Sequence, residues 1–310
     1  MKRFAGAVFI LAALIGSASG ADMALKAPPP AAPTWTGLYA GVNVGYGWGD
    51  SRTDIAGSGG ITTFQGIVAG FTGFPSNFAF TDSASARLNG LTGGGQIGYN
   101  YQLNQGWVVG VEADLQAAGQ SGNNEFSDQF STPVCGNAVG RNPPVCAGTT
   151  PLVATAATGY EAKIDGFATV RGRVGYLIAD QVMLYGTGGL AYGRVEINGN
   201  ASIPSAAITG GPTTFVPSAG TFDVAKNNLG YSIGGGVEGR TFAWLPPNWT
   251  WKAEYLYLDL ESLDSGTSFS SVLPAGRGGP VISPLTGTVA LHSHFIDNIV
   301  RVGLNYKFGN

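Results

Sequence analysis

The chain has 310 residues, and only 11% of them are charged, whereas an ordinary soluble domain carries roughly 25%. A conventional water-facing surface is therefore excluded. Once Lys2 and Arg3 leave with the leader described next, 14 Lys and Arg remain against 19 Asp and Glu, and the net charge of −5 argues against nucleic acid as a partner.

The N-terminus has the features of a cleavable signal peptide over residues 1–21. The two basic residues precede an apolar stretch at 4–15, and small residues at 17–21 provide a cleavage site. This stretch is shorter than the ~20 residues of a membrane-spanning helix, and no later run reaches that length. Residues 22–33 contain Ala-Pro-Pro-Pro-Ala-Ala-Pro and predict an extended periplasmic linker, which leaves 34–310 as the folded domain.

Segments that alternate apolar and polar side chains begin at residue 38 and recur to the end of the chain. In the first of them, Leu38, Val42 and Trp48 share one face while Asn43 lies on the other. A period of two predicts a β-strand. About eight such strands are predicted, at 38–48, 88–101, 107–116, 163–176, 182–193, 229–242, 249–259 and 300–308.

The connections between these strands alternate in length. The short turns are at 102–106, 177–181 and 243–248, and the long segments are at 49–87, 117–161, 198–226 and 261–291. Bacterial transmembrane barrels show this alternation, with the long loops outside the cell and both termini in the periplasm. We therefore predict an all-β fold, a closed antiparallel transmembrane β-barrel of about eight strands with four long extracellular loops.

The low charge and the positions of the aromatic residues indicate which face meets lipid. A soluble barrel also alternates, but it needs more charge on its outer surface than this chain has. Trp and Tyr lie near the ends of the apolar faces, as the aromatic girdles of a membrane barrel require. The girdle candidates are Trp48, Tyr99, Tyr101, Trp107, Tyr176, Trp249, Trp251 and Tyr306.

The polar face must then line the lumen. An eight-stranded barrel is just wide enough to hold its own side chains, and buried charges must pair to offset their desolvation. We expect a salt-bridge network that fills the lumen. Its candidates are five acids and seven bases: Glu112, Asp114, Asp165, Glu238, Glu254, Lys163, Arg171, Arg173, Arg240, Lys252, Arg301 and Lys307.

Four short motifs resemble the small outer-membrane β-barrel surface antigens of alpha-proteobacteria, often called the porin family. They are Trp-Thr-Gly-Leu-Tyr-Ala-Gly at 35–41, Val-Arg-Gly-Arg-Val-Gly-Tyr at 170–176, Tyr-Gly-Thr-Gly-Gly-Leu-Ala-Tyr-Gly at 185–193 and Val-Gly-Leu-Asn-Tyr-Lys-Phe at 302–308. The resemblance spans about 34–310. It implies insertion by the outer-membrane assembly machinery, with Tyr306 and Phe308 as the C-terminal signal, and a place in the bacterial outer membrane beside lipid and lipopolysaccharide.

Two further pairs of residues are candidate sites. Cys135 and Cys146 are the only cysteines, and an oxidising periplasm favours a disulfide between them over two free thiols. His292 and His294 share one face at the start of the last strand, where a haem or metal contact competes with exposed histidines at a loop edge. Neither a hydrolase motif nor a cofactor site is recognisable, so an enzyme is not predicted.

Three functions remain open from the sequence. The first is a structural, surface-exposed barrel that supports envelope integrity. The second is a narrow porin for ions or small solutes, and the third is a surface receptor or adhesin whose long loops bind haem or a host ligand. A filled lumen favours the first and third, because it leaves no path for solutes.

Overall fold

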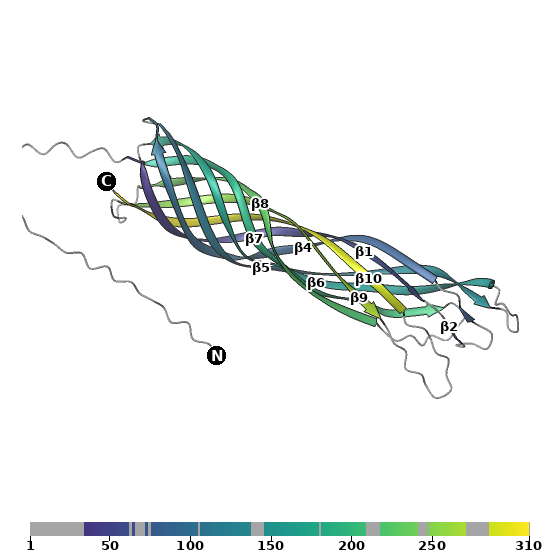
Figure 1. Cartoon of the computed structure of the whole chain (residues 1–310). Coiled ribbons are helices and arrows are strands. Elements are labelled where there is room, and N and C mark those ends of the chain that lie inside the picture. The colour runs from purple at the N-terminus through teal and green to yellow at the C-terminus, as the bar shows by residue number, and fades with distance from the viewer. Residues whose placement is uncertain are drawn as a thin grey trace, which may run out of the picture. The chain divides into compact units, whose positions relative to one another are not determined.

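The computed structural model describes residues 34–309 except 62–63, 66–71, 74–75, 105, 138–145, 180, 209–217, 241–245, 247 and 271–284. The predicted signal peptide and linker lie outside the described residues. Eight long antiparallel strands form a closed barrel in the order β1-β10-β9-β8-β7-β6-β5-β4 (Figure 1). Their bounds are β1 Gly37–Ile61, β4 Ser76–Gln102, β5 Trp107–Asn137, β6 Cys146–Ala179, β7 Val182–Ile208, β8 Ser218–Gly239, β9 Trp249–Ser270 and β10 Leu285–Lys307.

Two remaining strands, β2 Phe64–Gln65 and β3 Thr72–Gly73, pair only with each other. No helix in the described part of the chain is long and apolar enough to cross a membrane. The predicted fold class, a closed antiparallel barrel of eight strands, is confirmed.

The prediction of four long loops is not confirmed, because the described residues of those segments are mostly strand. The barrel strands have 22 to 34 residues, whereas a transmembrane strand needs only ~9–11. Strand β1 continues to Ile61, for example, and β10 begins at Leu285, in register with it. Each strand therefore runs far beyond the segment that a membrane can cover.

The polarity of the two faces of β1 reverses along the strand. Up to Trp48 the outward side chains are apolar, and Val42 and Trp48 are exposed. From residue 50 onward the outward side chains are Asp50, Arg52 and Asp54, while the inward Ile55 is fully buried. The alternation itself does not change, so lipid faces the first part and water the second. We call these parts of the barrel the membrane-spanning half, next to the barrel's own termini at Gly37 and Lys307, and the distal half.

In the distal half the barrel separates into two sheets. The β4–β5 register ends at Asn89 and Ser121, and the β8–β9 register ends at Gly230 and Leu260. Beyond these points, among the described residues, β4 and β9 are in register only with β1 and β10, while β5 and β8 are in register only with β6 and β7. The distal half is thus a sandwich of the sheets β4-β1-β10-β9 and β5-β6-β7-β8.

Side chains bridge the two seams between these sheets. Asn124 Nδ2 donates to the carbonyl of Ser85, 2.8 Å away, across the β4–β5 seam. At the other seam Asn228 Nδ2 donates to the carbonyl of Glu261, and Thr267 Oγ1 donates to that of Thr221. These bonds satisfy backbone carbonyls that the sheets leave unpaired.

The space between the distal sheets holds the main apolar core. Its members are buried and come from both sheets, and the larger ones include Ile55, Phe80, Phe126, Ile164, Val195, Phe222, Leu263 and Phe295. The sandwich is therefore packed like a soluble domain, although it continues the strands of a membrane barrel.

Candidate functional site

Eight ionised side chains gather inside the membrane-spanning half, and each contacts at least one opposite charge. The network consists of Glu112, Asp114, Glu238, Glu254, Arg171, Arg173, Lys252 and Arg301. Four are acids and four are bases, so their formal charges cancel. All eight side chains are at least 97% buried.

Arg171 on β6 is central to this network. Its Nη2 lies 2.7 Å from both Glu112 Oε1 and Asp114 Oδ2, and its Nη1 lies 3.2 Å from Glu254 Oε1. Its Nε also donates to Thr169 Oγ1. Arg171 therefore holds together carboxylates from β5 and β9, strands that are not neighbours in the barrel.

The remaining cations extend the network around the lumen. Arg301 Nη2 on β10 contacts Glu254 at 2.5 Å and Asp114 at 3.0 Å. Lys252 Nζ lies 3.0 Å from Glu112 Oε1. Every cation thus has short contacts to carboxylates, which is the arrangement that offsets the desolvation of buried charge.

Neutral side chains complete the network on the strands that contribute no charge. Tyr39 on β1 donates to Glu112 at 2.7 Å and accepts a hydrogen bond from Arg173 at 2.9 Å. Tyr185 on β7 donates to Glu254, and its ring lies 4.1 Å from the Arg173 guanidinium carbon. Tyr39 has the same phase as Asn43 on the polar face of β1, but nothing in its residue type indicates that it bridges two charges.

A second polar group joins Glu238 to the opposite wall. Asn305 Nδ2 donates to Glu238 Oε1 at 3.0 Å, and Gln96 Nε2 on β4 donates to Asn305 Oδ1 at 2.6 Å. Asn43 on β1 in turn donates to Gln96. With these contacts all eight strands place a side chain in one connected lumen network.

Apolar layers cover the network on both sides. Toward the termini lies a cluster of Trp35, Val108, Met183 and Tyr185. On the other side the apolar core begins with Leu256 and Ile299, two residues along β9 and β10 from Glu254 and Arg301. The described side chains thus place an ionic layer between two apolar clusters, and the buried polar side chains of Gln116, Gln120 and Asp297 lie on the distal side of it. This arrangement can hold charge rigidly, because every charged side chain in it is buried against an opposite charge.

Four predicted lumen charges lie elsewhere. Lys163 and Asp165 have side chains that are 32% and 44% exposed in the distal half, where Lys163 pairs with Glu161 and Asp165 with Arg194. The cause is a bulge between Ile164 and Gly166 in the β6–β7 register, which shifts the alternation by one residue. The hydrogen bond from Lys163 to Glu161 raises the pKa of Lys163 above its usual value.

Arg240 and Lys307 lie at the termini end of the barrel, outside the lumen network. The Arg240 guanidinium carbon is 4.4 Å from the centre of the Trp35 ring. Lys307 is opposite Tyr39 in the first register pair between β1 and β10. Both residues lie at strand ends, at the rim of the barrel. Alternation predicts that a side chain belongs to the polar face, but it does not predict whether that side chain lies at the rim or inside the lumen.

Sequence reasoning also missed one buried acid. Asp297 on β10 is 1% exposed, and its Oδ2 accepts a hydrogen bond of 2.8 Å from Gln120 Nε2 on β5. Gly47 makes room for this contact, because a Cβ there would lie 1.6 Å from Gln120 Nε2. Asp297 lies on the same inward face of β10 as Arg301, but its neighbours on that face are the apolar Ile299 and Phe295. The sequence around it therefore does not indicate a lumen charge.

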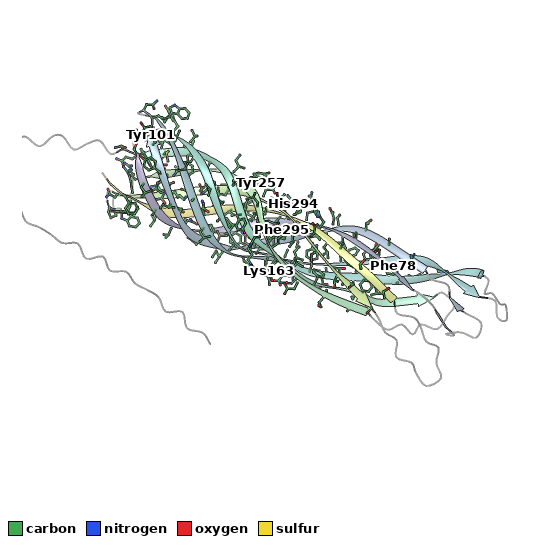
Figure 2. All side chains as sticks on the ribbon, viewed as in Figure 1. Phe78, Tyr101, Lys163, Tyr257, His294 and Phe295 are labelled. Carbon is green, nitrogen blue, oxygen red and sulfur yellow. The ribbon has the colours of Figure 1, made fainter. Side chains whose placement is uncertain are left out.

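The aromatic girdle candidates all lie on the outward face. Seven are at the termini end, where Trp107 packs on Tyr176 with ring centres 5.2 Å apart, and Trp249 packs on Tyr306 at 5.5 Å. Trp48 is at the other boundary, in the same register row as Tyr257. Figure 2 shows Tyr101 near the termini end and Tyr257 farther along the barrel, with His294 beyond it.

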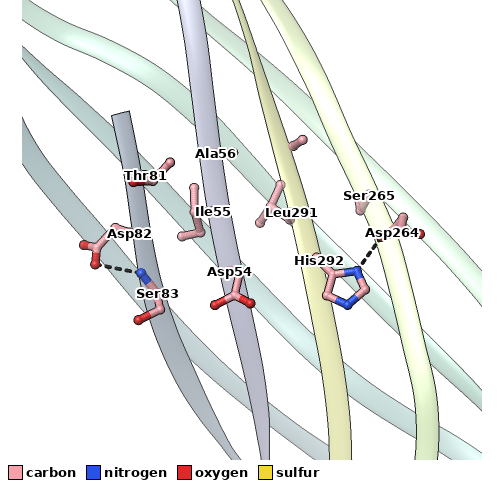
Figure 3. Close-up of a pocket in the computed structure, with 11 residues that line it drawn as sticks. Asp54, Ile55, Ala56, Thr81, Asp82, Ser83, Asp264, Ser265, Leu291 and His292 are labelled. Atoms are coloured by element: carbon pink, nitrogen blue, oxygen red, sulfur yellow. Dashed lines mark hydrogen bonds and ion pairs between the residues drawn. The ribbon is translucent and has the colours of Figure 1, made fainter. Parts of the chain in front are cut away.

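The two histidines lie within β10 and not at a loop edge. His292 Nδ1 is 2.6 Å from Asp264 Oδ1, and His294 Nε2 is 3.1 Å from Asp259 Oδ1. Residues around His292 line a pocket of about 660 Å³ on the distal half, and Figure 3 shows His292 pointing toward Asp264. Within the described residues, no group of three or more His, Cys, Asp or Glu could hold a metal ion.

The predicted disulfide stays a prediction. The backbones of Cys135 and Cys146 belong to β5 and β6, which are paired, and Cys146 is opposite Asn137. The side chains of both cysteines lie outside the described residues.

Comparisons with known proteins agree with the barrel. The family model of the outer membrane protein beta-barrel domain matches residues 11–308. The chain is 32% identical to the 31 kDa outer-membrane immunogenic protein of Brucella melitensis, over 96% of this chain and 97% of that protein. It is 31% identical to the 22 kDa outer membrane protein of Rhizobium leguminosarum, over 69% of this chain and 66% of that protein.

Among solved structures, Ail, the attachment invasion locus protein of Yersinia pestis, matches 84% of this chain and 99% of its own, with 13% identity and a TM-score of 0.26. The resemblance to alpha-proteobacterial surface antigens is confirmed by the curated relatives. The chain belongs to the outer membrane β-barrel family, and it is a protein of the bacterial outer membrane.

Proposed function

We propose that this protein is a non-conducting anchor that carries a rigid β-sandwich at the cell surface, and that its role there is structural. The filled interior supports this proposal most strongly. Arg171 and its three carboxylate partners occupy the lumen, and apolar layers lie on both sides of them. The pore hypothesis needs a polar path through these layers.

The orientation follows from the lengths of the connections. The end with the termini has the short connections, such as the one from Gln102 to Trp107, and barrels of this kind keep short turns and termini in the periplasm. The distal half then extends outward from the cell. A packed sandwich can support the envelope surface or present an epitope without being mobile itself.

A receptor role is the second candidate, and the pocket beside His292 favours it. The pocket lies on the outer surface of the sheet β4-β1-β10-β9, and it contains Asp54 and Asp264 as well as the histidine. A ligand could therefore be bound by the walls of the sandwich and not only by loops.

Cysteine labelling on intact cells tests the proposed orientation. Ser58 lies outward on the distal half, and Gln181 is exposed in the turn before β7. We expect Ser58→Cys to react with a membrane-impermeant maleimide on intact cells, and Gln181→Cys to react only after the outer membrane is permeabilised. The unsubstituted chain measures the background from Cys135 and Cys146. Labelling of Gln181→Cys alone on intact cells would contradict the proposal.

A further inference from the structure

Four cations lie on the outward face of the distal half near its boundary with the membrane-spanning half, and of these Lys163 is only partly exposed. Lys163 is 2.9 Å from Glu161, and Arg194 is 3.3 Å from Asp165. The other two, Arg52 on β1 and Arg87 on β4, are exposed. Neither makes an ion pair with any described residue, so their guanidinium groups are available to an external ligand.

The strand register brings Arg52 and Arg87 close to each other. Arg87 is directly opposite Asp50, and Arg52 is the next outward residue on the same strand as Asp50. Two such diagonal positions on neighbouring antiparallel strands lie roughly 7–8 Å apart, within the reach of long side chains. Both guanidinium groups can therefore converge on one tetrahedral anion, which they bind by paired hydrogen bonds.

The aromatic residues below this pair fix its height above the membrane. Trp48 is four residues before Arg52 on β1, and Tyr46 donates a hydrogen bond to Asn89, two residues after Arg87 on β4. Trp and Tyr of a girdle lie at the level of the lipid headgroups. Four residues of a tilted strand rise about 10 Å, so the arginines reach the outer part of the headgroup layer.

The neighbouring acids shape the choice of ligand. Asp50 and Asp54 flank Arg52 on the outward face of β1. Their two negative charges balance the two positive charges of the arginine pair. A balanced patch has little long-range attraction for anions, and binding must come from direct contact with the guanidinium groups. A phosphate group at headgroup height meets this requirement, because its oxygens match the geometry of two arginines.

We propose that Arg52 and Arg87 form a binding site for a phosphate group on the headgroup of an outer-leaflet glycolipid. The site would fix the rotation and depth of the barrel in the membrane. The inference rests on the proposed function in one respect, since the distal half must face outward for this lipid to reach the arginines. The labelling experiment decides that orientation, and a binding experiment in detergent does not depend on it.

Lipid A with two phosphates, titrated into the refolded protein in detergent and followed by native mass spectrometry, tests the site. The test variant is Arg52→Gln with Arg87→Gln. The control variant is Lys163→Gln with Arg194→Gln, which removes the same charge at cations that already have carboxylate partners. We expect the dissociation constant to rise about tenfold or more in the test variant, and to stay unchanged in the control.

Two further arms identify the chemistry. Dephosphorylated lipid A should bind the unsubstituted chain and the test variant equally weakly, and inorganic phosphate should compete with lipid A only in proteins that keep both arginines. Equal loss in both double variants would overturn the proposal, as would unchanged binding in the test variant or tight binding of the dephosphorylated lipid. If the test variant gave little folded protein, Arg87→Gln alone would serve, with a smaller loss expected.

Discussion

Replacing Arg171 by Met is expected to lower the free energy of unfolding by about 3–5 kcal/mol. The substitution removes the contacts to Glu112, Asp114 and Glu254 while filling much of the same space. Three carboxylates would then share fewer cations in a buried site, and uncompensated buried charge is strongly destabilising. Urea unfolding of the protein in lipid vesicles, followed by tryptophan fluorescence, measures the change.

Arg194→Met is the matched control for this experiment. Arg194 also pairs with an acid, Asp165, but both side chains are about half exposed. Solvent screens such a pair, so its loss should have little effect. Equal destabilisation by the two substitutions would show that the lumen network does not hold the strands together.

Replacing Phe295 by Ala is expected to destabilise the distal half by about 3–5 kcal/mol, because it leaves a cavity in a packed core. Phe295 on β10 is fully buried between the distal sheets. The membrane-spanning half has its own network below this point. We therefore expect limited proteolysis to cut the distal strands of the variant much faster, while a fragment embedded in lipid stays protected.

Ile296→Ala is the control for this cavity. Ile296 is the next residue on β10 and faces outward, where it is only partly buried. Its truncation should leave the rate of proteolysis nearly unchanged. If the Phe295 variant lost protection of both halves together, the distal sandwich and the membrane-spanning half would be one cooperative unit.

The membrane-spanning strands were predictable because their two faces differ strongly in polarity. Strand 107–116, for example, alternates Val109 and Val111 with Glu112 and Asp114, and the structure keeps this phase. The distal strands were not recognised, because small residues interrupt the apolar inward face, as Ala154 and Ala156 do on β6. Such a composition also occurs in loops, and only the inward burial of these alanines separates the two structures.

The charged lumen was predictable in part for the same reason. Eight of the twelve candidate charges meet in one network, since their strands keep a constant phase. The bulge at Asp165 shifts the phase on β6, and no residue pattern near it indicated this. The two apolar clusters form from inward side chains of several strands that lie at the same height in the barrel. The register between strands sets these heights, and the sequence of a single strand does not reveal them.

The central claim is that the interior of this barrel is filled, and single-channel conductance in a planar lipid bilayer tests it most directly. The measurement uses the refolded protein without its signal peptide, with insertion confirmed by β-type circular dichroism in the same lipid. We expect a silent bilayer, since the buried network around Arg171 occupies the lumen and apolar clusters lie on both sides of it. Stable, discrete current steps from the folded protein would contradict the claim and would make the lumen a conducting pore.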